Sequence, residues 1–270
     1  MSAKESCASG GTKEDDDIKA AELRDEILFK QPESSHLGDC PICCLPLSLD
    51  AHQNNKTSCC GKTLCGGCDY ANYKREFEQR MQPMCPFCRH PAPKSDEEAD
   101  INYMKRVEAN DPAAICYMGD VSLLEGDYGK SFEYWTKAAE LGHIDAHYNL
   151  SMLYHNGHGV EKDMKKQLYH LEEAAIGGHV DARHILGYLE KENGRGYRAL
   201  KHMIIAANMG HDDSLGVIKE SFKMGIVSKE DFAAVLRAHR AAVVATISPQ
   251  RKEAEAVRQK MKAASSARQK

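Results

Sequence analysis

A short motif returns three times in the second half of this 270-residue chain. It is AAELGHID at residues 138 to 145, AAIGGHVD at 174 to 181 and AANMGHDD at 206 to 213. The copies are 36 and then 32 residues apart, a period typical of stacked helix pairs. Because such a pair buries its apolar face only against its neighbours, we expect an α-helical solenoid of stacked helix pairs.

The spacing of apolar residues divides each unit into two helices. The first helix has apolar residues at i, i+4 and i+7, which share one face. They are Ala146, Leu150 and Leu153 in one unit and Ala182, Leu186 and Leu189 in the next. After the glycine-rich turn NGHGV at 156 to 160, a second helix is expected to have its own inner stripe. That stripe comprises Met164, Leu168, Leu171 and Ala175.

Each copy of the motif contains a glycine followed directly by a histidine, near its end. Gly142, Gly178 and Gly210 stand where a helix commonly stops in a left-handed conformation. The histidines that follow are His143, His179 and His211. We favour a structural role for them over a role as ligands, because stacking displaces equivalent positions along the solenoid. A histidine just beyond a helix end also interacts favourably with the helix dipole.

These features resemble the Sel-one-like repeat, a relative of the tetratricopeptide helix pair. The resemblance rests on the alanine pair before each glycine, the Trp135-x-x-Ala138-Ala139 run and the Gly-x-Gly-Val turn at 157 to 160, and it covers about residues 111 to 240. It implies an extended concave face that binds peptides or other proteins. A fourth unit from about Asp213 departs from the pattern, and we expect it to cap the solenoid.

A second region, between Cys40 and Cys88, is rich in cysteine and proline. The N-terminal sequence MSAKESCASGGTKEDDD has no apolar stretch, so we expect no secretory signal. The longest apolar run, AAVVA at 241 to 245, is far shorter than the roughly 20 residues of a transmembrane helix. We therefore expect a cytoplasmic or nuclear protein, in which cysteines are better interpreted as thiolate ligands of zinc than as disulfides.

Three Cys-x-x-Cys knuckles lie in this region: Cys40 with Cys43, Cys65 with Cys68, and Cys85 with Cys88. Because zinc takes four ligands in a tetrahedron, six thiols cannot close two sites. The adjacent thiols of Cys59 and Cys60 are the available pair. Lys62, which stands where a histidine would be expected, cannot replace them, because an ammonium has no lone pair. Other possible ligands are Cys44, His90 and His52, of which His52 is the strongest substitute for Cys59.

The full spacing, Cys-x2-Cys-x15-Cys-Cys-x4-Cys-x2-Cys-x16-Cys-x2-Cys, resembles a RING finger of the eight-cysteine, U-box-like kind. The resemblance covers residues 37 to 94 and implies two structural zinc ions in a cross-braced arrangement. It assigns Cys40, Cys43, Cys65 and Cys68 to one site and Cys59, Cys60, Cys85 and Cys88 to the other.

The same resemblance implies a role in ubiquitin transfer. RING proteins bind a ubiquitin-conjugating enzyme and favour transfer of its ubiquitin, and they supply no nucleophile. Ile42 and Pro86 match the two contacts with the conjugating enzyme, and Arg89 matches the arginine that braces the loaded ubiquitin. Each has a structural alternative: Ile42 in a small core, Pro86 in shaping its knuckle, and Arg89 as surface charge.

One feature departs from the RING pattern. Many RING ligases carry a tryptophan a few residues beyond the sixth ligand, whereas the single tryptophan of this chain is Trp135, in the repeats. Tyr70, Tyr73 or Phe77 is expected to take its place. The choice of conjugating enzyme, and activity itself, depend on this substitution.

We therefore expect a mostly α-helical protein in which a small zinc-stabilised RING module precedes the solenoid. The divisions are an acidic, partly disordered segment at 1–36, the RING at 37–94, a linker helix at 95–110 begun by the capping box of Ser95 and Glu98, the repeats at 111–240, and a C-terminal helix with a basic tail at 241–270. Residues from Ser228 onward should form two helices broken at Ser248 and Pro249. Phe232, Val235 and Leu236 should cover the end of the solenoid, and the last residues should fray.

The expected function is that of a ubiquitin ligase whose RING binds a conjugating enzyme and whose repeats recruit a protein substrate. The alternative is a non-catalytic scaffold, in which the zinc module only binds or dimerises. Nucleic acid is a weaker possibility, because residues 37–94 are not strongly basic and lack a regular pattern of aromatic and basic residues. The net charge of -4 suggests neither a nucleic-acid nor a membrane partner.

Overall fold

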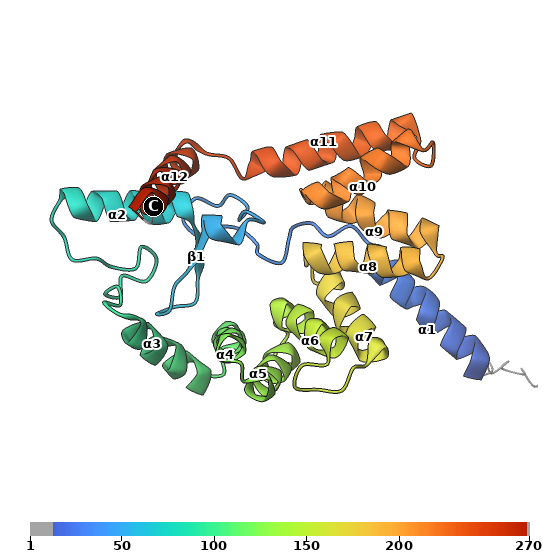
Figure 1. The fold of residues 1–270 in the computed structure, drawn as a ribbon, viewed down its shortest axis with the longest axis horizontal. Helices are drawn as coiled ribbons and strands as arrows, with labels where there is room; N and C mark the ends of the chain where they lie inside the picture. Colours follow the sequence, from blue (N-terminus) through green and yellow to red (C-terminus); the bar gives the residue numbers. More distant parts are fainter. Residues whose placement is uncertain (1–12, 269–270) are drawn as a thin grey trace, which may run out of the picture.

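The computed structural model describes residues 13–268, which are mostly helical (Figure 1). The helices are α1 (Lys13–Leu28), α2 (Gly66–Glu78), α3 (Asp96–Glu108), α4 (Pro112–Leu124), α5 (Tyr128–Glu140), α6 (Ile144–Asn156), α7 (Met164–Ile176), α8 (Val180–Glu192), α9 (Gly196–Asn208), α10 (Asp212–Lys223), α11 (Lys229–Ala245) and α12 (Pro249–Arg268). Among the described residues, no helix is both long and apolar enough to cross a membrane.

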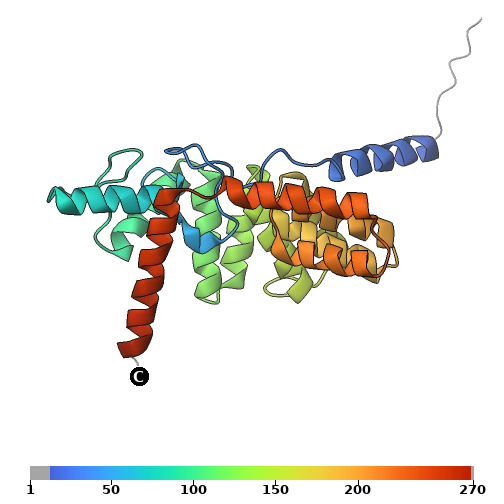
Figure 2. The same ribbon diagram turned by 90° about the horizontal axis from the view of Figure 1, so that it is seen from above.

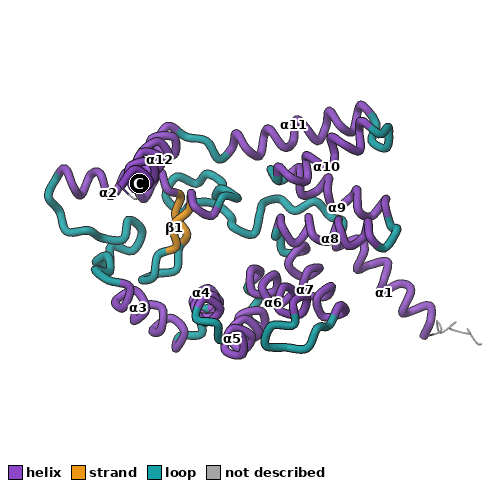
Figure 3. Tube along the Cα trace, in the orientation of Figure 1, coloured by secondary structure: helices purple, strands orange, loops and turns teal. Residues whose placement is uncertain are grey.

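The cysteine-rich region is mainly loops, as the tube in Figure 3 shows. It contains a short 3₁₀ helix, η1 (Ala51–Gln53), and the strands β1 (Asn54–Lys56) and β2 (Thr63–Cys65). The strands pair antiparallel, with Asn54 opposite Cys65 and Lys56 opposite Thr63. Helix α2 follows β2 directly and begins at a cysteine, since Cys65 is its N-cap.

From α4 to α9 the helices pack as antiparallel pairs, α4 on α5, α6 on α7 and α8 on α9, which confirms the predicted solenoid (Figure 1). The pairs follow one another along an arc that continues through α10 and α11. Gly142, Gly178 and Gly210 have φ angles of 83°, 88° and 95°, as predicted for left-handed helix ends. The turn from one unit to the next therefore uses a left-handed glycine at the same place in each unit.

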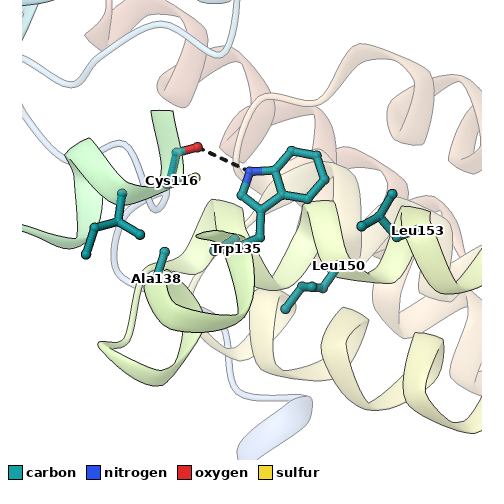
Figure 4. Close-up of a cluster of buried hydrophobic side chains, with 7 residues drawn as sticks. Cys116, Trp135, Ala138, Leu150 and Leu153 are labelled. Atoms are coloured by element: carbon teal, nitrogen blue, oxygen red, sulfur yellow. Dashed lines mark hydrogen bonds between the residues drawn. The ribbon is translucent and has the colours of Figure 1, made fainter. Parts of the chain in front are cut away.

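Trp135 lies at the centre of the first helix pairs (Figure 4). Its indole is 2% exposed and packs with Ile115, Ala138 and Leu150. Its Nε1 donates to the Cys116 carbonyl oxygen at 3.2 Å and to Asp120 Oδ1 at 3.1 Å. A Cβ at residue 119 would lie 2.4 Å from this nitrogen, so Gly119 is needed for the close approach of α4.

The repeated histidines have the structural role that we favoured, for a different reason. They are the N-caps of α6, α8 and α10. His179 Nδ1 accepts the Ala182 N–H at 3.3 Å, and His211 Nδ1 accepts the Ser214 N–H at 3.1 Å. Nε2 of each ring faces the aspartate of the preceding unit, at 3.9 Å from Asp145 and 3.3 Å from Asp181. Each of these two rings therefore starts a helix and joins two repeats.

The last helices close the solenoid and then leave it. Val235 is 3% exposed and packs with Met203 and Leu215, and Phe232 stacks on Phe222 at 4.5 Å, as a cap requires. Leu236 is 38% exposed, so its predicted place in the cap is wrong. The helix break at Ser248 is confirmed, and the boundary expected at 241 falls inside α11.

Helix α12 turns back and packs on α2 of the cysteine-rich region (Figures 1 and 2). The sequence predicted only a C-terminal helix with a tail that frays, and it gave no partner for this helix. The described chain thus forms a closed arrangement in which the solenoid leads from the cysteine-rich region and back to it.

Helix α1 lies within the segment 1–36 that was predicted to be acidic and partly disordered, and its C-terminal end packs against the solenoid. Leu28 is 1% exposed and packs with Leu171, Ala175 and Leu186. Its carbonyl oxygen accepts a hydrogen bond from the buried Arg183 guanidinium, which also donates to Ala175 at 2.7 Å. Residues 1–12, on which the rest of that prediction falls, lie outside the described residues.

Helix α3 begins where the capping box predicted, and Ser95 Oγ accepts the Glu98 N–H at 3.4 Å. The largest aliphatic residues of α3 do not lie on its buried face. Ile101 is 55% and Met104 40% exposed, while Tyr103 is 4% and Arg106 9% exposed. The Tyr103 ring stacks on Tyr117 at 3.7 Å, which joins α3 to α4.

Candidate metal centre

Eight sulfur atoms converge in two separate places in the cysteine-rich region. The first cysteine group comprises Cys40, Cys43, Cys65 and Cys68, and the second comprises Cys59, Cys60, Cys85 and Cys88. Within each group the four sulfur atoms lie within 4.8 Å of one another. The structure therefore brings together the two sets that the RING resemblance implies, interleaved along the chain.

Two knuckles in different groups have the same backbone turn. The Cys44 N–H donates to the Cys40 carbonyl at 2.8 Å, and the Arg89 N–H donates to the Cys85 carbonyl at 3.0 Å. Cys44 and Arg89 both have positive φ angles, of 54° and 61°. An isolated bridge closes each turn, between residues 39 and 46 and between 84 and 91. Each turn presents its two sulfur atoms on one side, as a metal knuckle requires.

Backbone N–H groups point at the sulfur atoms of the first cysteine group. The Cys65 N–H donates to Cys40 Sγ and the Cys68 N–H to Cys65 Sγ, both at 3.4 Å. Burial by itself would raise the pKa of the Cys40 thiol, but hydrogen bonds from the backbone of Cys65, Cys43 and Ile42 lower it to about 7. The backbone thus favours a thiolate at this position.

At two other cysteines the pKa of the thiol is raised instead of lowered. Burial, followed by neighbouring thiols, raises the pKa of Cys68 in the first group and of Cys59 in the second. Four crowded thiolates repel one another, and a divalent cation at their centre removes that penalty.

The sulfur spacing fits zinc. A tetrahedron with Zn–S bonds of about 2.3 Å places its sulfur atoms roughly 3.8 Å apart. The separation is 3.8 Å between Cys43 and Cys65, 3.4 Å between Cys59 and Cys88, and 3.9 Å between Cys60 and Cys85. Among the described residues no cysteine forms a disulfide. Both groups can therefore hold a zinc ion, with four thiolates each.

The alternative ligands lie outside both groups. Cys44 and His90 are exposed, and His52 is an exposed residue of η1 rather than a substitute for Cys59. The Lys62 ammonium lies 5.8 Å from the centre of the Phe87 ring. Lys62 is thus a neighbour of the second group with no coordinating role.

Apolar side chains are exposed around the two groups. Ile42 is 43% and Phe87 44% exposed, each inside a Cys-x-x-Cys knuckle. Pro86 is half-buried and Arg89 is exposed. Of the aromatic residues considered in place of tryptophan, Tyr70 and Tyr73 line a cleft of about 320 Å³ shared with α12. Phe77 projects from α2 with 74% of its surface exposed, so it is available to a partner.

Two arginines from outside the region hold the cysteine groups, and sequence analysis identified neither. Arg106 of α3 donates to the Ser58 carbonyl at 3.2 Å, next to the second group. Arg251 of α12 lies against the first group, with Nη2 3.5 Å from Cys43 Sγ. These contacts span 48 and 208 residues of sequence, so no local motif could indicate them.

A third cluster of possible metal ligands joins the solenoid to the segment before Cys40. It consists of His36, Asp145 and His179, and His36 Nε2 lies 3.0 Å from Asp145 Oδ1. His179 Nδ1 accepts a backbone N–H, so the neutral ring carries its proton on Nε2, the atom that faces Asp145. The two imidazoles also stack in parallel, 4.2 Å apart, so their nitrogen lone pairs do not converge. This arrangement fits a structural joint between two repeats and the segment before Cys40 rather than a metal site.

Comparison with known proteins identifies the solenoid. The Sel1 repeat family model matches residues 112–143, 144–179 and 181–211. The match lies outside the cysteine-rich region. Among curated proteins, the chain is 39% identical over 56 residues to a putative beta-lactamase, HcpC, of Helicobacter pylori, an alignment covering 21% of this chain and 19% of that protein.

A second curated relative is DAP3-binding cell death enhancer 1 of Rattus norvegicus, 30% identical over 70 residues, which cover 26% of this chain and 14% of that protein. The chain thus aligns with less than a fifth of each of these two relatives.

Two solved structures align with part of the chain. One is a Sel1 repeat protein from Oxalobacter formigenes, with a TM-score of 0.48 and 22% identity over 64% of this chain and 71% of that one. The other is c5321, a protective antigen of uropathogenic Escherichia coli strains, with a TM-score of 0.43 and 21% identity over 72% of this chain and 41% of that one. The family match and the helix pairs agree: residues 112–211 of this chain are Sel1 repeats.

Proposed function

We propose that this protein is a zinc-dependent RING-type ubiquitin ligase in which the Sel1 repeats recruit the protein to be modified. The observation that carries the proposal is the interleaving of the two cysteine groups. The knuckle of Cys40 and Cys43 shares one group with that of Cys65 and Cys68, while Cys59 and Cys60, which lie between them in the sequence, share the other group with Cys85 and Cys88. Two closed zinc sites of this kind hold a fold and leave no open coordination position for chemistry. The zinc module therefore acts through its surface.

That surface has the properties needed to bind a conjugating enzyme. Ile42 and Phe87 expose apolar side chains on the knuckle turns. Because these side chains are not buried in the core of the module, a partner can contact them. Arg89 is exposed and comes directly after the last cysteine, on a turn fixed by the Cys85 carbonyl. A guanidinium can donate to two carbonyl oxygens at once, which suits an arginine that braces a bound ubiquitin.

The solenoid is the part of the chain suited to hold a second protein. Stacked helix pairs offer a surface much longer than a small globular domain offers. Contacts through Arg106 and α12 fix the zinc module relative to this surface. A protein bound to the repeats would therefore be held at a defined position from the conjugating enzyme, which favours transfer by proximity.

The direct test is the discharge of ubiquitin from a panel of loaded conjugating enzymes to free lysine. The full chain should accelerate discharge from at least one enzyme, and Ile42→Ala should abolish the acceleration while both zinc ions are retained. Ile226→Ala is the matched control, because Ile226 is 62% exposed in the turn after α10, away from the zinc module. It should discharge ubiquitin at the wild-type rate.

The alternative is a non-catalytic scaffold, in which the zinc module binds a partner or dimerises. A folded protein that carries two zinc ions and accelerates discharge from no enzyme of the panel would favour the scaffold. Acceleration that survives Ile42→Ala would instead contradict the proposed docking surface.

A further inference from the structure

We propose that Arg251 of the C-terminal helix is a positioning residue of the first zinc site, and that it makes retention of that ion depend on α12. The inference rests on the proposed zinc sites and concerns a residue 163 positions beyond Cys88, the last cysteine of the two groups. Arg251 belongs to the basic C-terminal region, for which the sequence suggested no specific partner.

The Arg251 guanidinium is held by four acceptors, which fix its position. Nη1 donates to the Pro46 carbonyl at 2.6 Å and to the Thr246 carbonyl at 2.9 Å. Nη2 donates to the Leu45 carbonyl at 3.2 Å and to Cys43 Sγ at 3.5 Å. The fork therefore binds the backbone of the first knuckle and one of its ligand atoms together, which a lysine ammonium on a flexible chain cannot reproduce.

Charge gives this contact its importance. Four thiolates around one dication leave an excess of two negative charges at the first cysteine group. A cation in contact with a ligand sulfur reduces that excess. At the second cysteine group a hydroxyl contacts a sulfur atom, since Thr57 Oγ1 lies 3.2 Å from Cys60 Sγ, while the Arg106 cation binds the neighbouring Ser58 carbonyl. The two sites thus differ in their surroundings, although both have four cysteines.

The helix that carries Arg251 is placed by other contacts with the zinc module. Gly67 allows the close approach, because a Cβ there would lie 2.7 Å from the Arg251 backbone nitrogen. Glu253 accepts a hydrogen bond from the Lys74 ammonium at 2.9 Å, and Ser248 Oγ accepts the Arg251 N–H at 3.2 Å. Arg251 is therefore presented by a capped helix start that rests on α2.

Groups that orient a metal ligand commonly change metal affinity about 10- to 100-fold when they are removed. We therefore expect Arg251→Gln to release zinc from the first site at least about tenfold faster and to leave the second site unchanged. Arg251→Lys keeps the positive charge and loses the forked guanidinium. Its rate of zinc release from the first site should therefore lie between those of the wild type and Arg251→Gln.

The experiment follows zinc release from the full chain into a chromogenic chelator, with circular dichroism to show that each variant is folded. Loading with cadmium-113 and recording its NMR spectrum gives one resonance for each site, so that the altered site is identified. The matched control is Arg258→Gln. Arg258 lies two turns further along α12 and donates to the His52 carbonyl at 3.3 Å, without a sulfur contact.

Faster loss of one ion in Arg251→Gln, a shift of one cadmium resonance and wild-type behaviour of Arg258→Gln would support the inference. Release at the wild-type rate from Arg251→Gln would overturn it. Equal acceleration at both sites would also overturn it, since Arg251 would then act only through general stability. A wild-type chain with no bound zinc would instead refute the zinc sites on which the inference rests.

Discussion

Arg106 Nη1 donates to the carbonyl oxygen of Ser58 at 3.2 Å, across 48 residues of sequence. Ser58 directly precedes the second cysteine group, and Arg106 is 9% exposed on α3. The same guanidinium donates from Nε and Nη2 to Asp111 Oδ2, at 3.0 and 2.9 Å. Asp111 is the N-cap of α4, so one side chain joins the zinc module to the start of the repeats.

Arg106→Gln should lower the free energy of unfolding by about 2 kcal/mol, because hydrogen bonds to charged groups contribute roughly 1.5–3 kcal/mol each and a buried carbonyl is left without its donor. Urea unfolding at pH 7 measures the change. Lys105→Gln, at an exposed position on the same helix, is the control and should unfold like the wild type. Equal unfolding of the Arg106 and Lys105 variants would show that this contact does not stabilise the junction.

Buried histidines make the solenoid sensitive to acid. Burial, followed by neighbouring charges, lowers the pKa of His179 to about 4 and that of His202 to about 3, from 6.5. As the pH falls below about 6.5, the unfolded chain takes up a proton at each ring that the folded chain refuses. The free energy of unfolding should therefore decrease between pH 6.5 and about 4, by roughly 1.4 kcal/mol per pH unit for each such ring.

His202 allows this prediction to be tested at one site. The ring is fully buried, packs 4.7 Å from the Phe29 ring, and neither of its nitrogens has a hydrogen-bond partner among the described residues. His202→Leu should keep its stability at pH 7 and reduce the slope of stability against pH by about one proton. Phe77→Leu, at an exposed position, changes no titratable group and should leave the slope unchanged. Both variants keep the same cysteine groups, so the difference between their slopes isolates the contribution of His202.

The sequence predicted those parts of the molecule that depend on local patterns. Gly178 and the apolar positions Leu150 and Leu186 follow from turn chemistry and helix periodicity, which act over a few residues. The two cysteine groups followed from spacing combined with a family resemblance. The sequence did not predict the contacts between distant segments that Arg251 and Arg106 make. The charge of an arginine and the periodicity of its helix do not indicate which distant residue it contacts.

Helix α3 shows the same limit at the level of a single face. Its largest aliphatic residues, Ile101 and Met104, are exposed, and the buried positions are Tyr103 and Arg106. Tyr103 packs on Tyr117, and Arg106 reaches a carbonyl of the zinc module. The neighbours of a short helix between two domains decide its buried face, and hydrophobicity alone does not reveal them.

We propose that two interleaved tetrathiolate zinc sites hold the module from which the ligase acts. Native mass spectrometry of the full chain, together with Cys40→Ser, Cys85→Ser and Cys44→Ser, tests it most directly. We predict two zinc ions in the wild type, loss of one ion in Cys40→Ser and in Cys85→Ser, and two ions in Cys44→Ser, whose thiol lies outside both groups. A wild-type chain with one zinc ion or none, or loss of zinc in Cys44→Ser, would contradict the account.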